Sequence, residues 1–160
     1  MTQPIRAFSL WQPWASFMAW GYKPDETRGY PTKVRGQVAI HAAKVLDDAG
    51  ADWDLTAFVF AASDLRQACP GGAYVAVGDL WDCVPTESIE HEVSEVDRLA
   101  GNFAVGRSAW RFRTIRPLAE PIPAKGKQGF WWWTPPDDLE ARLLPPVDHA
   151  EIVRKWEART

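Results

Sequence analysis

The residues whose types and spacing best suit chemistry lie in one short stretch that contains Lys23, Glu26, Thr27 and Arg28. A lysine, a carboxylate and a guanidinium at spacings of three and two can form a compact ionised cluster in a loop. A lysine that is desolvated beside a guanidinium can serve as a base. The same spacing also suits a set of salt bridges that only fixes the loop. The residues by themselves leave both interpretations open.

A helix before this stretch and a strand after it would hold the cluster in place. Apolar residues at near-helical spacing predict a helix over residues 10–21, with Pro13 in its first turn. The run Val38–His41 is typical of a buried strand. Further strands are expected at Ala73–Val84, Ala109–Ile115 and Gly129–Trp133, with a proline-rich corner between the last two. Further helices are expected over residues 54–67, 88–99 and 148–159.

Length and composition suit one compact domain with a substantial core. The chain has 160 residues, of which 46% are hydrophobic, and two independent domains would be cramped at that size. Paired prolines open the tail and recur in its middle, and Trp156 lies in its helical end. We therefore divide the chain into a domain over residues 1–134 and an extension over residues 135–160, which packs on the domain through Trp156.

Basic residues are concentrated in two segments that flank an acidic one. Residues 1–44 hold six Lys or Arg against two acids, and residues 105–130 hold six against one. Residues 45–104 hold two against twelve, so the net charge is only −3. If the fold joins the two basic segments, one face suits a phosphate-bearing ligand. Ordinary solvated cations paired with the acids of the middle segment would give the same pattern.

Tryptophan is used unusually often, at ten positions. A tryptophan buries on the order of 200 Å², so we expect most of these rings in the core. Strand alternation sends Trp131 and Trp133 to one face and Trp132 to the other, which favours at least one ring near a surface or pocket. An aromatic ring beside basic residues can stack on a base, although such runs more often fill both faces of a covered strand.

The cysteines and histidines are not spaced as metal ligands. Cys69 and Cys83 lie far outside Cys-x-x-Cys spacing, and His41, His91 and His149 stand in unrelated segments. We expect no metal and no cofactor. No apolar run approaches the roughly 20 residues that cross a bilayer, and no early basic start precedes an apolar run. These observations predict a soluble, cytoplasmic protein without membrane contact.

Four motifs, in the right order, resemble ASCH domains of the PUA-like superfamily. They are Ser9-Leu-Trp-Gln-Pro-Trp-Ala15, Gly21-Tyr-Lys23-Pro-Asp-Glu26-Thr-Arg28, Arg35-Gly36 with Ile40-His41-Ala42, and Lys125-Gly-Lys-Gln-Gly-Phe-Trp131. Together they bracket residues 5–133. The resemblance implies an α+β fold, a small PUA-like β-barrel with flanking helices, to which the C-terminal helical extension is added. It also implies that the Lys23 stretch sits in a cleft beside the Gln12-Pro13-Trp14 segment.

The resemblance, together with the charge pattern, predicts recognition of RNA or a modified nucleoside by a monomer or weak homodimer. The basic residues of the first segment would contact phosphate, namely Lys23, Arg28, Lys33 and Arg35. Trp14 or Trp132 would stack on a base, and Gln12 or Glu26 would read a base edge.

An amidohydrolase is the alternative, because the chain resembles small ASCH enzymes that act on N4-acylated cytidines with a Lys, Thr and Glu set. Lys23 matches the lysine, but the position of the threonine holds Glu26, with Thr27 next to it. Water activated by Lys23 and Glu26 is then the expected nucleophile. Glu87 and Asp79 are candidates for the third carboxylate.

Overall fold

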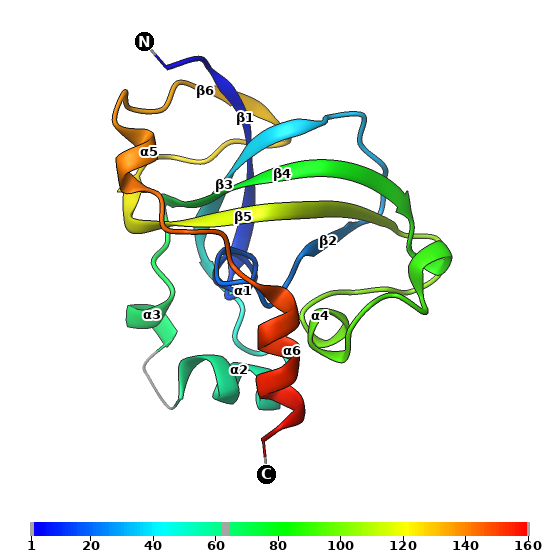
Figure 1. Ribbon diagram of the computed structural model, residues 1–160. Coiled ribbons are helices and arrows are strands. Elements are labelled where there is room, and N and C mark those ends of the chain that lie inside the picture. Colours follow the sequence, from blue (N-terminus) through cyan, green and yellow to red (C-terminus); the bar gives the residue numbers. More distant parts are fainter. Residues whose placement is uncertain (1, 62–64, 160) are drawn as a thin grey trace.

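The computed structural model describes residues 2–61 and 65–159 and shows a six-stranded sheet with short helices around it (Figure 1). The strands are β1 (Ile5–Gln12), β2 (Asp25–Arg28), β3 (Gly36–Leu46), β4 (Ala73–Pro85), β5 (Ser108–Pro123) and β6 (Trp131–Trp133). The helices are α1 (Trp14–Ala19), α2 (Trp53–Phe60), α3 (Leu65–Ala68), α4 (Glu95–Leu99), α5 (Leu139–Arg142) and α6 (His149–Glu157), with a 3₁₀ turn, η1 (Thr86–Ile89).

The sheet is mixed and strongly curved. Its strand order is β2-β5-β4-β3-β1-β6, with β1 and β3 parallel and the other pairs antiparallel. Register shifts in the long β4–β5 ladder are the positions at which such strands bend, and β1 crosses β4 and β5 steeply in Figure 1. The predicted α+β class is confirmed. The described pairings leave β2 and β6 at the two edges, so they do not close the sheet into a barrel.

Helix α1 lies between two clusters of the core. Its Ala15, Met18 and Ala19 pack with strand residues such as Phe8 and Trp110. Phe17, on the opposite side of the same helix, packs with residues of α2, α4 and α6. Because both faces are buried, this six-residue helix is fixed in place, and so is the loop that leads from it to β2.

Several elements begin or end elsewhere than the sequence predicts. Leu10 to Gln12 belong to β1, and helix α1 starts only after Pro13. Helix α2 ends where Ala61 turns left-handed, and residues 62–64 of the expected 54–67 helix lie outside the described residues. The expected 88–99 helix is a 3₁₀ turn followed by α4, because the Ser94 side chain accepts from the Asp97 N–H and starts a new helix there.

The expected proline corner is wrong, because residues 117–123 continue β5. Proline cannot donate to a strand ladder and is tolerated where one side of a strand is unpaired. Strand β2 pairs only with Ser108–Arg111, so among the described strands none pairs with the rest of β5 on that side. The tail covers part of that side, with the N–H of Leu144 donating to Pro117 O and that of Val147 to Ile115 O.

The tryptophans are less buried than expected. Five of the ten are exposed, and Trp132 is 62% accessible while Trp131 on the other face is 8% accessible. The predicted alternation in the Trp131 to Trp133 run is therefore confirmed, whereas the prediction that most rings are core is wrong. Arginines cover part of this exposed aromatic surface, with Arg6 4.3 Å from the ring of Trp132 and Arg111 5.3 Å from that of Trp81.

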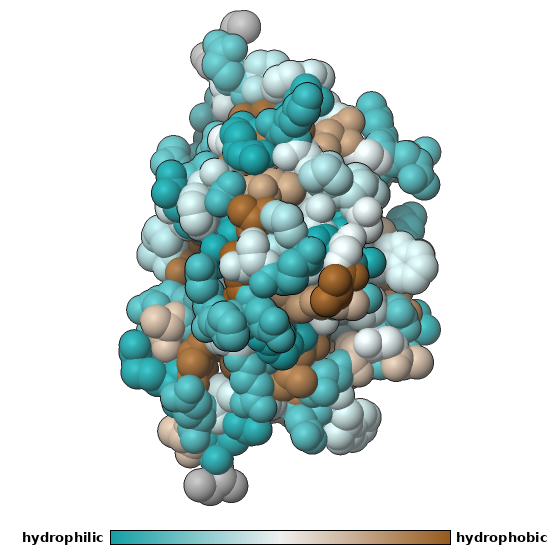
Figure 2. All heavy atoms as spheres, turned by 90° about the vertical axis from the view of Figure 1, so that its right-hand side faces the viewer, coloured by the Kyte–Doolittle hydropathy of each residue, from teal (hydrophilic) through white to brown (hydrophobic). Residues whose placement is uncertain are grey.

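The surface that carries α4 is largely hydrophilic. Figure 2 shows this side of the molecule, where apolar residues are scattered among polar ones and form no single broad patch. Within residues 2–61 and 65–159, no helix is both long and apolar enough to cross a membrane.

Replacing Trp156 by alanine should unfold the protein more easily, because this ring is 1% accessible and packs against Phe58 at 5.3 Å. We expect Trp156→Ala to lower the free energy of unfolding by about 3–5 kcal/mol. Trp132→Ala, in an exposed ring, should lower it by less than about 1 kcal/mol. Urea denaturation followed by circular dichroism measures both, and equal losses would contradict anchoring of the tail by Trp156.

Candidate functional site

Strand β2 carries the Lys23 stretch along an edge of the sheet. Asp25 pairs with Arg111 of β5, and Thr27 pairs with Ala109. The turn that leads into β2 contains Gly21 at φ +89°, where a Cβ would lie 2.8 Å from Ile152 and 2.9 Å from Val147. Glycine is therefore required both by the left-handed backbone and by the close approach of the tail.

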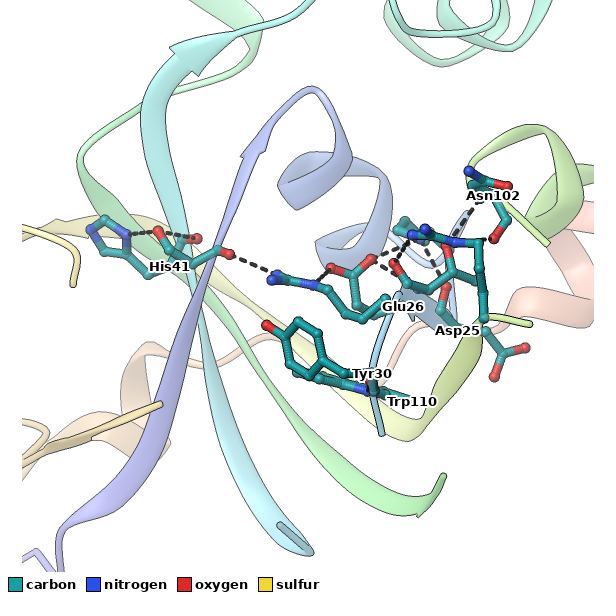
Figure 3. Close-up of polar contacts among 11 residues, drawn as sticks. Asp25, Glu26, Tyr30, His41, Asn102 and Trp110 are labelled. Atoms are coloured by element: carbon teal, nitrogen blue, oxygen red, sulfur yellow. Dashed lines mark hydrogen bonds and ion pairs between the residues drawn. The ribbon is translucent and has the colours of Figure 1, made fainter. Parts of the chain in front are cut away.

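Lys23, Glu26 and Arg28 form the ionised cluster that their spacing predicts. Lys23 is 1% accessible, and its Nζ donates to Asp25 O at 2.8 Å and pairs with Glu26 Oε1 at 3.2 Å. The second oxygen of Glu26, Oε2, accepts from Arg28 Nε at 2.8 Å. The Glu26 carboxylate thus lies between two cations (Figure 3).

Arg28 is held in one orientation by polar and aromatic neighbours. Its Nη2 donates to Ser9 O at 3.1 Å, and its guanidinium lies 5.2 Å from the Trp110 ring and 5.6 Å from the Phe8 ring. Burial by itself would lower the pKa of Arg28, but the charge and hydrogen bond of Glu26, together with the neighbouring Tyr30 hydroxyl, outweigh it, so this pKa is raised. Arg28 therefore keeps its positive charge in a partly buried position.

A cleft of about 400 Å³ opens beside this cluster. Trp11, Trp14 and the loop that follows α4 form walls around Lys23, Glu26, Thr27 and Arg28. The loop is tied to β2, because Asn102 N–H donates to Thr27 Oγ1 at 3.0 Å and Arg107 Nη2 donates to Thr27 O at 3.1 Å. We call this hollow the Lys23 cleft.

A pair of buried carboxyl groups lies beneath the cluster. Asp25 accepts from Arg111 Nε at 3.1 Å, and Asp97 faces Asp25 from α4. Asp97 is 1% accessible, and among the described residues its Oδ1 finds no hydrogen-bond partner. Burial raises the pKa of Asp97 well above its usual range, and the facing Asp25 carboxyl raises it further, while Lys23 acts in the opposite direction. A protonated Asp97 can donate to Asp25.

A second and larger hollow, of about 650 Å³, adjoins the Lys23 cleft. Residues 124–130 all contribute to its lining, and we call it the 124–130 hollow. The two hollows share Ser9, Trp11 and Arg28. Arg28 and Lys44 from the first basic segment meet Lys125 and Lys127 from the second here. The fold therefore joins the two basic segments.

Only some of the residues that the sequence predicts to contact a ligand line the two hollows. Trp14 lines the Lys23 cleft with Lys23, Glu26, Thr27 and Arg28. Gln12 is buried behind α1, where its amide donates to Pro70 O and accepts from Ser16 N–H. Lys33, Arg35 and Trp132 line neither hollow. Contacts from these three residues would require a ligand that extends beyond both hollows.

The two carboxylates suggested as a third catalytic member also lie outside the Lys23 cleft. Asp79 pairs with Arg113 at 2.7 Å, and Glu87 accepts from Gly106 N–H. Sequence reasoning missed Trp11 and Arg107 of the cleft wall and Asp97 beneath it. Trp11 stands inside the first motif and could have been singled out. Nothing in the sequence distinguishes Asp97 from the surface acids around it.

Comparison with solved structures relates the fold to a bacterial ASCH protein. The chain is similar to ASCH from Zymomonas mobilis with 16% sequence identity and a TM-score of 0.51, over 89% of this chain and 97% of that one. A single-residue variant of the same protein gives 14% identity and a TM-score of 0.50, over 87% and 98%. No protein-family model and no curated protein matches the chain. The resemblance to ASCH domains is thus confirmed at the level of the fold.

Replacing the titratable carboxyl of Asp97 by an amide should make stability less dependent on pH. Since the folded-state pKa of Asp97 is raised, the stability that its protonated form contributes is present at low pH and is lost as pH rises through that pKa. Asp97→Asn stays neutral throughout. The free energy of unfolding of Asp97→Asn minus that of wild type should therefore rise as pH increases above about 4. The expected slope is on the order of 1 kcal/mol per pH unit, until pH reaches the folded-state pKa of Asp97.

Urea denaturation at a series of pH values measures this difference. The series starts at about pH 4, which is near the ordinary pKa of an aspartate. Asp48→Asn, at an exposed position, is the control and should give a difference that does not change with pH. A flat difference for Asp97→Asn as well would contradict the proton on Asp97.

Proposed function

We propose that the Lys23 cleft binds RNA or a modified nucleoside. The observation that carries this proposal is the position of Arg28, which Glu26 and Ser9 hold at the boundary of two adjoining hollows. An oriented guanidinium is suited to a phosphate or to the edge of a base. A volume of about 400 Å³ also lies within the range of small-molecule sites, roughly 300–1,000 Å³.

The walls of the cleft supply the other contacts that a nucleoside needs. Trp11 is 54% accessible and Trp14 is half-buried, so each has ring surface on which a base can stack. Arg107 adds a second guanidinium to the lining of the cleft. Lys23 donates to two acceptors, and because an ammonium group has three N–H donors, one remains for a carbonyl oxygen of the ligand.

The hydrogen bonds of Lys23 favour binding over catalysis. A general base needs a free lone pair in reach of the proton that it abstracts. Here Nζ lies 2.8 Å from a backbone carbonyl and 3.2 Å from a carboxylate, which are both acceptors. This arrangement suits an ammonium group that donates hydrogen bonds.

Substitution of the cleft arginines should weaken RNA binding. We expect Arg28→Ala and Arg107→Ala each to lower the affinity for a single-stranded RNA hexamer of mixed sequence by about tenfold or more, because each removes charged hydrogen bonds. Arg142→Ala, in an exposed ion pair of α5, should stay within about twofold of wild type.

Fluorescence anisotropy with labelled RNA at several salt concentrations gives the affinities, and circular dichroism verifies that each variant is folded. The affinity of wild type should fall as salt rises, since phosphate contacts release counterions. An affinity that does not depend on salt, or equal losses in all three variants, would refute the assignment of phosphate contacts to this cleft.

Amide hydrolysis is the second candidate, and one observation favours it. Lys23, Glu26 and Thr27 line the same cleft, with Nζ of Lys23 3.2 Å from Glu26 Oε1. In this scheme Lys23 takes a proton from water, the resulting hydroxide attacks the amide carbonyl, and the C–N bond breaks as the amine leaves with a proton. Glu26 would orient the water.

Incubation with N4-acetylcytidine distinguishes hydrolysis from binding. If the protein is an amidohydrolase, chromatography should show cytidine and acetate, and Lys23→Ala and Lys23→Arg should both abolish turnover. Arginine keeps the charge but cannot serve as a base at neutral pH. Thermal unfolding controls for misfolding, because loss of Lys23 leaves the Glu26 carboxylate with one partner fewer. Turnover retained in a folded Lys23 variant would exclude Lys23 as the base.

A further inference from the structure

We propose that the 124–130 hollow is a second subsite, which binds the phosphate and the neighbouring base of a single-stranded RNA whose first nucleoside lies in the Lys23 cleft. This inference rests on the proposed function. It extends that function from a nucleoside site to a groove that holds at least two linked nucleotides.

The geometry joins the two hollows into one groove. Ser9, Trp11 and Arg28 line both of them. The 124–130 hollow has about 650 Å³ against about 400 Å³ for the Lys23 cleft, so the larger part of the groove lies beyond the motif around Lys23. A free nucleoside would fill the smaller part alone. A ligand with a phosphate and a second base would use both.

The charge of the second hollow is available to a ligand. Lys44, Lys125 and Lys127 line it and are exposed, and within residues 2–61 and 65–159 none of them pairs with a carboxylate. The arginines of β5 differ, because carboxylates pair with Arg111, Arg113 and Arg116. The cations around this hollow are thus the ones that a phosphate could neutralise.

The hollow also offers aromatic surface beside those lysines. Tyr30 is 53% accessible and its ring lies edge-on to Trp110, with 5.8 Å between centroids. Trp110 is 2% accessible and stacks on Phe130 at 5.3 Å, so it supports the Tyr30 ring from within the core. Trp11, which is exposed, stands at the junction with the Lys23 cleft. Aromatic rings interleaved with cations are the combination that single-stranded nucleic acids require, because bases stack while phosphates pair.

The segment 124–130, which lines the hollow, is already fixed at its start. His41 Nε2 lies 2.8 Å from Ala124 O and therefore carries the hydrogen of this bond, while Nδ1 accepts from Ser9 Oγ at 2.7 Å. A Cβ on Gly126 would lie 2.7 Å from His41 Cε1, so only glycine allows this approach. The backbone that carries Lys125 and Lys127 is thus held before a ligand arrives, which lowers the backbone entropy lost on binding.

The test compares Lys44→Ala/Lys125→Ala/Lys127→Ala with Arg142→Ala/Arg154→Ala/Lys155→Ala, which removes three exposed cations of the tail. The probes are a labelled single-stranded RNA hexamer of mixed sequence and cytidine. We expect the lysine variant to bind RNA at least about tenfold more weakly. Each lost phosphate contact should lower the magnitude of the slope of log affinity against log salt by about 0.7, so loss of three contacts should lower it by about 2. Its affinity for cytidine, and both affinities of the tail variant, should stay within about twofold of wild type.

The outcomes separate this inference from the proposed function. If Arg107→Ala weakens RNA binding but the lysine variant binds with wild-type affinity and salt slope, the second subsite is refuted and the Lys23 cleft stands. If wild type binds cytidine but not RNA, the second subsite is likewise refuted. If wild type binds neither probe, the proposed function fails and this inference fails with it.

Discussion

The Glu26 carboxylate holds together the part of the molecule to which we assign function. One of its oxygens accepts from the Thr27 N–H and pairs with Lys23, and the other binds Arg28. Removing such charges from water costs several kcal/mol per ion, and their attraction offsets this only when the geometry is good and the remaining hydrogen bonds are made. The geometry is good here, with Glu26 Oε2 2.8 Å from Arg28 Nε and Glu26 Oε1 3.2 Å from Lys23 Nζ. A four-residue edge strand, which by itself would be mobile, therefore presents a guanidinium in a fixed orientation.

The fixed cations and the free cations of the groove have different roles. Lys23 and Arg28 are bound to Glu26 at the base, so they supply directed hydrogen bonds but little net charge. The lysines of the 124–130 hollow have no acidic partner among the described residues and supply the net charge. Directed bonds give discrimination, whereas unneutralised charge gives affinity and salt dependence. Such a division suits a groove that distinguishes one base while it holds a phosphate backbone.

Predictions from the sequence succeeded where the determining contacts are local. Lys23, Glu26 and Arg28 lie within one turn and strand, so their spacing predicts their geometry. The meeting of the two basic segments depends instead on the pairing of β2 with β5, which are far apart in the sequence, so charge alone gave it only as a conditional expectation. Asp97 could not be found, because its burial depends on α4, which a contact between Glu95 and Trp156 joins to the tail 61 residues away. The prolines of residues 117–123 led to the wrong prediction of a corner for a similar reason. A strand tolerates proline where one side lacks a partner strand, and which side lacks one depends on the strand order of the whole sheet.

Trp11 lines both hollows, so a ligand that covers its exposed ring gains free energy of burial at the point where the hollows meet. At 54% accessibility this ring leaves much of its apolar surface in water, and each 100 Å² that a ligand covers is worth about 2.5 kcal/mol. Arginines offset a similar exposure at Trp81 and Trp132. Trp11 instead faces the space shared by both hollows, beside Arg28. A base stacked there would recover the lost burial at the point where its phosphate enters the lysine-lined hollow, so stacking and charge neutralisation would reinforce each other.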